Sequence, residues 1–139
     1  SVDMIQSVDS FKLAQEINRL ALNNEKVMDI LCEVNIGGED SKSGVTPDEL
    51  KELIEQISTL KGLQVRGLMT IPPPLNSDIF LGKMKELFDK ISSENISGIK
   101  MDTLSMGMTH DYVQAIKHGS TVVRIGTGLF GQRNYDLKK

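Results

Sequence analysis

The 139-residue sequence predicts an α/β fold built from parallel βα units. Short apolar stretches typical of buried strands alternate with amphipathic stretches that have a helical period. Successive strand-like stretches recur roughly every 20–40 residues, which leaves room for the crossover helix between two parallel strands. Two polar, glycine-containing segments near the C-terminus, residues 105–111 and 123–131, each follow such a stretch. They therefore fall where α/β folds bind ligands, just beyond the carboxyl ends of strands.

The five predicted strands are short apolar runs bounded by turn-forming residues. They cover residues 4–7, 28–36, 63–71, 102–105 and 121–124. Gly37 and Gly38 end the second run. Prolines 72–74 end the third, because proline suits neither a helix interior nor an interior strand. A stiff extended loop at a strand end accounts for these prolines better than a ligand for a proline-recognition domain does.

The four predicted helices show caps and apolar residues three or four positions apart. They cover residues 9–22, the stretch from Thr46 to Gly62, the stretch through Phe80 to Ile91, and the stretch from Thr109 to Gly119. Asp9 or Ser10 can cap the first helix. The second has the strongest start signal, because Thr46 supplies a capping hydroxyl, Pro47 suits the first helical position and Glu49 completes a capping box.

The composition predicts a single globular domain over residues 1–139. The formal net charge of −3 argues against a basic surface for nucleic acid, and the apolar runs are too short to span a bilayer. The only cysteine, Cys32, lies in an apolar run, so we expect a core residue and a reducing, cytoplasmic environment. Neither a nucleic acid nor a membrane is an expected partner.

Residues far apart in the sequence should meet at one edge of the sheet, because parallel strands place their carboxyl ends together. The residues expected at this edge are Ser7, Asn35, Met69, Thr70, Ser105, Gly107, Arg124, Gly126 and Thr127. Glycine lets the backbone approach a ligand, while hydroxyls, backbone N–H groups and an arginine suit a phosphate dianion. A helix that begins near Thr109 would add a favourable dipole. The edge therefore predicts a site for a phosphorylated ligand.

Other kinds of site have weak support in the sequence. His110 and His118 lie eight residues apart without a second ligand pair, so no metal site is predicted. The spacing suggests no serine or cysteine triad, and we predict no catalytic residue. His118 beside Gly119 is better explained as the end of a helix than as a catalytic group. The glycine-rich loop of residues 37–44 is not a P-loop. It is interpreted equally well as a mobile loop over the site or as a plain surface loop.

In combination these segments resemble the pyridoxal-phosphate homeostasis protein family. The resemblance is strongest over residues 104–111 and 123–131 and extends over essentially the whole chain. Further matching stretches are residues 7–9, 34–36, 39–44, 66–69 and 71–74. Thr109 replaces the serine usual in the family and keeps the hydroxyl.

The resemblance implies a TIM-type, fold-type III barrel like the N-terminal domain of alanine racemase, with pyridoxal 5′-phosphate (PLP) at the carboxyl ends of its strands. By position, Ser105, Gly126 and Thr127 would contact the phosphate. Arg124 matches the arginine that faces the pyridine nitrogen in this fold type. A cation there keeps that nitrogen unprotonated, which suits racemisation or storage better than broad carbanion chemistry.

The family holds its cofactor as a Schiff base on a lysine at the end of the first barrel strand, and this motif has no match in the 139 residues. A complete barrel needs eight strands and about 250 residues, so the resemblance implies the C-terminal portion of a barrel that is incomplete at its N-terminus. The implied function is non-catalytic PLP homeostasis. Bound PLP, or a phosphate or sulfate ion, would then be held non-covalently.

Open barrel edges also predict self-association. Two alternatives remain for the function: a fold-type III amino-acid racemase-like enzyme, or a phosphate-binding half-barrel without cofactor chemistry.

Overall fold

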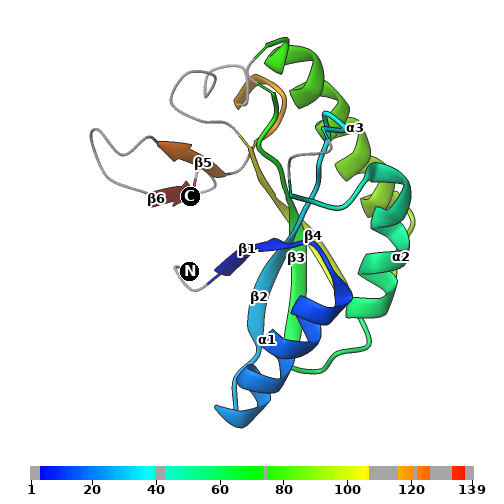
Figure 1. Cartoon of the computed structure of the whole chain (residues 1–139), viewed down its shortest axis with the longest axis vertical. Helices are drawn as coiled ribbons and strands as arrows, with labels where there is room; N and C mark the ends of the chain where they lie inside the picture. The colour runs from blue at the N-terminus through cyan, green and yellow to red at the C-terminus, as the bar shows by residue number, and fades with distance from the viewer. Residues whose placement is uncertain are drawn as a thin grey trace.

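One sheet with helices on one side forms the frame of the molecule (Figure 1). The computed structural model describes residues 4–39, 43–73, 75–106, 116–120, 122–125 and 133–136. The strands are β1 (Met4–Val8), β2 (Met28–Glu33), β3 (Leu63–Met69), β4 (Ile99–Ser105), β5 (Val122–Ile125) and β6 (Arg133–Asp136). The helices are α1 (Phe11–Asn23), α2 (Pro47–Ile57) and α3 (Ser77–Ser93). The strands lie in sequence order, with β1 to β5 parallel and β6 antiparallel to β5.

The parallel βα succession is confirmed, but the predicted counts of five strands and four helices are wrong for the described residues, which form six strands and three helices. The missed strand, β6, is short and polar, so it has no hydrophobic alternation to reveal it, and its structure comes from pairing with β5. The predicted helix of residues 109–119 falls mostly outside the described residues. Of that stretch, residues 116 and 117 are helical.

The helix starts were predicted more accurately than the helix ends. Ser10 caps α1, because its Oγ accepts a hydrogen bond from the Leu13 N–H at 3.1 Å. Thr46 occupies the cap position of α2, but its hydroxyl donates to Glu49 Oε1 at 3.0 Å and does not accept from a backbone N–H. The α2 helix ends at Ile57, well before Gly62, whose N–H instead donates to α1.

The strand bounds differ from the prediction by a few residues. β2 ends at Glu33 and β3 at Met69, both earlier than expected, while β4 starts at Ile99. Val34 no longer belongs to β2, but it forms an isolated parallel bridge with Val45. The predicted strand β2 was too long because the buried, apolar Val34 follows the strand and belongs to a packed loop.

The hydrophobic core lies between the helices and one face of the sheet. The helical side contributes Ala14 from α1, a buried stripe from α2, and Leu81, Met84 and Ile91 from α3. Each buried leucine, isoleucine or methionine of this set stabilises the fold by about 1.5–3 kcal/mol. Cys32 is buried in this core, and burial raises the pKa of its thiol to about 12, so the prediction of a core cysteine is confirmed.

The opposite face of the sheet carries polar side chains. Asp29 lies near the start of β2, and Arg66 and Asp102 lie in the middle of β3 and β4. Their neighbours Ile30 and Val65 belong to the core on the helical side and Met101 packs against it, so the three charged side chains lie on the other face. Within the described residues, no helix is long and apolar enough to cross a membrane. The same residues contain no group of three His, Cys, Asp or Glu side chains arranged to hold a metal ion.

Candidate functional site

The last residues of three neighbouring strands form one row across the sheet. Glu33 pairs with Met69, Met69 pairs with Ser105, and Ser105 pairs with Val122 of β5. Just past the end of β3, the Thr70 N–H also donates to the Ser105 carbonyl of β4 at 3.0 Å, so backbone pairing between the two chain segments extends one residue beyond the strand. The expected meeting of Met69, Thr70 and Ser105 at the carboxyl edge is thereby confirmed.

The Ser105 side chain is completely buried, and its hydroxyl donates to Gln6 Oε1 at 2.7 Å. Gln6 belongs to β1, three positions away from β4 in the sheet. Neighbouring strands lie about 4.8 Å apart, so a flat sheet would separate β1 from β4 by about 14 Å. The hydrogen bond therefore requires the sheet to curve around its polar face, as the wall of a barrel does.

Asn35 lies directly past this row, but its amide closes a local turn. Its Nδ2 donates to the Glu39 carbonyl at 2.7 Å, and its Oδ1 accepts from the Glu39 N–H at 3.2 Å. Both ends of the amide thus hold the start of the loop after β2. Contact between Asn35 and a ligand stays a prediction, whereas its role in shaping the loop is visible.

The loop after β2 is fastened to its neighbours at both ends. On one side the Gly44 N–H donates to Asp9 Oδ2 at 3.0 Å, and the Ser43 hydroxyl donates to Glu33 Oε2 at 2.7 Å. On the other side Gly37 lies so close to the Pro73 ring that an added Cβ would clash with it. The loops after β1, β2 and β3 therefore support one another. Residues 40–42 lie outside the described residues.

The remaining predicted ligand contacts lie at or beyond β5. Arg124 belongs to β5, two residues past the partner of Ser105, and pairs through its backbone with Asn134. Gly107, Gly126 and Thr127 lie outside the described residues, so their roles stay predictions.

The sequence prediction missed Gln6 and Glu33. Each is a polar residue that follows a buried or half-buried apolar residue of its strand, Gln6 in the middle of β1 and Glu33 at the end of β2, and that position is the signal that could have identified them. Glu33 is 7% exposed at the carboxyl end of β2, in the same row as Ser105. Ser7, which the prediction placed at the edge, is exposed.

His118 interacts with a helix that the sequence gave no reason to link to it. Its Nε2 lies 2.9 Å from Asp78 Oδ1, in the first turn of α3. Nearby, the Ser120 hydroxyl donates to the carbonyls of Leu104 at 3.1 Å and Met106 at 2.9 Å. These contacts hold residues 118–120 against α3 and the end of β4, which supports a structural role for His118.

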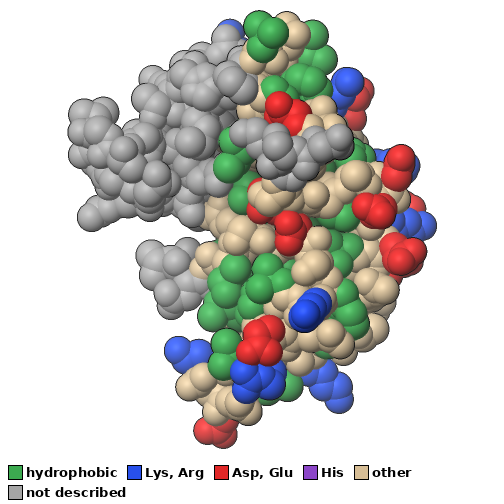
Figure 2. Space-filling view, in the orientation of Figure 1, with side chains coloured by type: hydrophobic (Ala, Val, Ile, Leu, Met, Phe, Trp, Pro, Cys, Tyr) green, Lys and Arg blue, Asp and Glu red, His purple; other side chains and the backbone are tan. Residues whose placement is uncertain are grey.

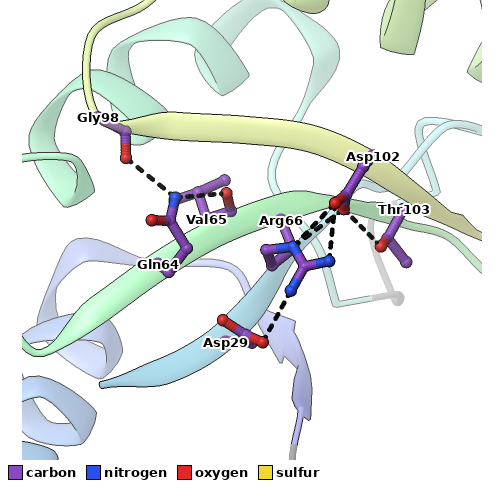
Figure 3. Close-up of polar contacts among 7 residues, drawn as sticks. All are labelled: Asp29, Gln64, Val65, Arg66, Gly98, Asp102 and Thr103. Carbon is purple, nitrogen blue, oxygen red and sulfur yellow. Dashed lines mark hydrogen bonds and ion pairs between the residues drawn. The ribbon is translucent and has the colours of Figure 1, made fainter. Parts of the chain in front are cut away.

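A charged network lies deeper on the polar face of the sheet (Figure 3). The Arg66 guanidinium contacts Asp102 through Nη2 at 2.7 Å and through Nε at 3.0 Å, and its Nη1 donates to Asp29 at 2.9 Å. Burial alone would raise the pKa of Asp102. Hydrogen bonds from Arg66 and Thr103 outweigh burial, so this pKa lies below its ordinary value. Arg66 thus joins three strands across the polar face.

Comparison with known proteins agrees with this architecture. The family described as alanine racemase, N-terminal domain, matches residues 1–134. The chain belongs to this family. Membership explains the parallel sheet with its polar residues at the carboxyl edge, which is where barrels of this kind bind their ligands.

Within the alanine racemase N-terminal domain family, the chain is similar to curated proteins named pyridoxal phosphate homeostasis protein. The protein from Aquifex aeolicus is 47% identical over 138 residues, which cover 96% of this chain and 60% of that protein. The protein from Haemophilus influenzae is 42% identical over 141 residues, which cover 99% of this chain and 59% of that protein. The resemblance is confirmed, and the chain spans about three fifths of the length of these relatives.

Solved structures of other proteins share the fold. PipY of Synechococcus elongatus with PLP bound superposes with a TM-score of 0.79 at 29% identity, over 93% of this chain and 61% of that chain. Alanine racemase of Clostridium difficile superposes with a TM-score of 0.69 at 19% identity, over 96% of this chain and 35% of that chain. The second similarity concerns the fold alone.

Proposed function

We propose that this chain binds pyridoxal 5′-phosphate reversibly at the carboxyl edge of its sheet and serves PLP homeostasis without catalysing a reaction. The observation that carries the proposal is Ser105, a buried hydroxyl on the polar face, in the same row as Met69. Curated relatives are named pyridoxal phosphate homeostasis protein, and PipY was solved with PLP bound.

The residues at the edge suit the phosphate end of such a ligand. The Ser105 hydroxyl is proposed to donate to a phosphate oxygen, and the backbone N–H groups near Gly107, Gly126 and Thr127 to complete the anion site. Arg124 is proposed to face the pyridine nitrogen and to keep it unprotonated. Met69, which is 3% exposed, supplies apolar surface beside the ring. When bound, PLP supplies an aldehyde that reacts with amines.

Replacing Ser105 tests the phosphate contact. We expect Ser105→Ala to weaken PLP binding about tenfold or more, because a hydrogen bond to a charged group contributes about 1.5–3 kcal/mol. Arg124→Ala should also weaken it. Calorimetric titration of the chain with PLP measures both effects. Ser93→Ala is the matched control, since Ser93 lies on the helical side and its hydroxyl donates to the Lys90 carbonyl.

Pyridoxal, which lacks the phosphate, shows whether Ser105 acts on the phosphate or on the rest of the ligand. If Ser105 contacts the phosphate, Ser105→Ala should leave the weak binding of pyridoxal nearly unchanged. A chain that binds PLP equally well with or without Ser105 and Arg124 would exclude this edge as the site. Incubation with L- and D-alanine, followed for loss of optical purity, checks the non-catalytic part of the proposal. Sustained racemisation would contradict it.

We further propose that the chain self-associates through β1 and α1. β1 is the first strand of the sheet, so the described residues place no strand on its outer edge. Beside it, α1 exposes Leu13 to 38% and Leu20 to 49%, and Figure 2 shows hydrophobic side chains among charged ones on this part of the surface. Unpaired strand edges and exposed apolar side chains both favour association with a second copy.

Charge introduced on α1 should abolish this association. We expect the unmodified chain to sediment as a dimer or larger species at micromolar concentration. The double variant Leu13→Glu/Leu20→Glu should shift it toward the monomer, because it places carboxylates in the interface. Lys12→Glu is the control, since it changes the charge of an exposed position of α1 that is not apolar. A monomeric unmodified chain would refute the proposal.

A cytoplasmic location is part of the same proposal. Cys32 is buried with a raised thiol pKa, so it is protected from oxidation and needs no partner. Such a free cysteine suits a reducing compartment.

A further inference from the structure

Gln6 is the described side chain that contacts the Ser105 hydroxyl most directly. It lies in the middle of β1, is half-buried, and its Oε1 accepts the Ser105 hydroxyl proton at 2.7 Å. Ser105 is 0% exposed, so its hydroxyl is withdrawn from bulk water and its direction depends on neighbouring groups. In this arrangement the hydroxyl proton points toward Gln6, and the oxygen lone pairs point elsewhere.

That arrangement is unsuited to an anion, but a glutamine can reverse it. A phosphate dianion needs a donor from Ser105, whereas lone pairs repel it. The glutamine amide has an oxygen that accepts and an NH₂ group that donates, and the two ends have nearly the same shape. Rotation of the amide by half a turn would let Nε2 donate to Ser105 Oγ. The hydroxyl proton would then be released toward the ligand.

The absence of charge on the Gln6 side chain is as important for an anion site as the hydrogen bonds that this side chain makes. Glu33, in the same row as Ser105, already places a carboxylate at this edge, where the Ser43 hydroxyl donates to it. A neutral amide at position 6 adds polarity without a second negative charge. A carboxylate of the same size could only accept from Ser105, so it would hold the proton and repel a phosphate.

We propose that Gln6 is a positioning residue for the phosphate site, which sets the Ser105 hydroxyl as a donor when a phosphorylated ligand binds. The inference rests on the proposed function and adds a residue from β1, which is separated from β4 by two strands of the sheet. Gln6 acts through Ser105, so its effect should depend on both the ligand phosphate and the Ser105 hydroxyl.

The test titrates PLP, pyridoxal and inorganic phosphate into variants that retain the unfolding temperature of the unmodified chain. Gln6→Glu should weaken PLP and phosphate binding at least tenfold and change pyridoxal binding less than twofold. Gln6→Met, which keeps the length without charge or hydrogen bonds, should weaken PLP binding about threefold to tenfold. Gln15→Glu on α1 is the matched control, because it makes the same charge change at an exposed position.

A mutant cycle separates positioning from mere support of the fold. If Gln6 acts through the hydroxyl, Gln6→Met should add almost nothing once Ser105 is alanine, whereas additive losses would overturn the inference. A Gln6→Glu chain that binds PLP within twofold of the unmodified chain would overturn it while leaving the proposed function intact. Absence of PLP and phosphate binding by the unmodified chain would overturn both.

Discussion

Gly67→Ala is expected to abolish the native fold. Gly67 has φ of +153°, and an added Cβ would fall inside the carbonyl group of Thr103, its partner on β4. The obstacle is backbone in the middle of a sheet, so no side-chain rotation can relieve it. The register between β3 and β4 shifts at this point. We expect a loss of at least about 4 kcal/mol, which is comparable to the whole stability of a small domain.

Urea unfolding followed by circular dichroism measures this effect, with Gly82→Ala as its matched control. Gly82 lies inside α3, where an added Cβ would meet only the His118 ring at 3.5 Å, an ordinary contact. Alanine is the better helix former, so this variant should gain about 0.5–1 kcal/mol. A Gly67→Ala chain as stable as the unmodified one would show that the strands can separate at this register shift.

Arg66→Met has the second largest expected effect. The substitution keeps the length and removes the charge that lies between Asp29 and Asp102, which then repel each other on the polar face. Loss of one partner from a buried pair costs about 3–5 kcal/mol, but these side chains are about one quarter exposed, so we expect about 2 kcal/mol. Unfolding free energies at pH 7 measure the loss.

The loss should depend on pH in a defined direction. The folded pKa of Asp102 lies below its ordinary value, since hydrogen bonds from Arg66 and Thr103 outweigh the opposing effect of burial. The stability that this pair contributes is therefore complete above the unfolded pKa of about 4 and is lost as the pH falls through the folded pKa. The difference between the unmodified chain and Arg66→Met should narrow below about pH 4.

An exposed arginine provides the comparison. Arg19 pairs with Glu16 on the surface of α1, where water screens the interaction, so Arg19→Met should leave stability and its pH dependence unchanged. Equal effects of the two substitutions would show that Arg66 acts through its charge alone and not through its place between two carboxylates.

The residue pattern predicted the parts of the fold that depend on local physics. Helix starts and buried strands leave signals in neighbouring residues, as Ser10 and Cys32 show. The register between strands and the curvature of the sheet leave no such local signal, because they depend on residues that are distant in the sequence. Gly67 lies in a stretch used for the family resemblance, yet only the structure shows that its missing side chain makes room for Thr103.

The candidate site was predictable to the same extent. The row of Met69 and Ser105 follows from the rule that parallel strands end together, and it is confirmed. The polar character of Gln6 could have marked it as a candidate, but its pairing with the Ser105 hydroxyl could not be predicted, since no spacing rule relates a residue of β1 to one of β4, three positions away in the sheet. Contact between Asn35 and a ligand stays a prediction, and the loop-closing role of its amide was not foreseen, because a free amide and a loop-closing amide have the same sequence signature.

The hydrogen bond between Gln6 and Ser105 also has a consequence for folding. It joins residues 99 positions apart, so it can form only after the intervening strands have assembled. Contacts of such long range carry a large loop-closure entropy and tend to be completed late. A nascent or partly unfolded chain would therefore lack the hydrogen bond between Gln6 and Ser105. If the proposed phosphate site is correct, a bound ligand would favour the fully assembled sheet over partly unfolded chains and would protect it from degradation.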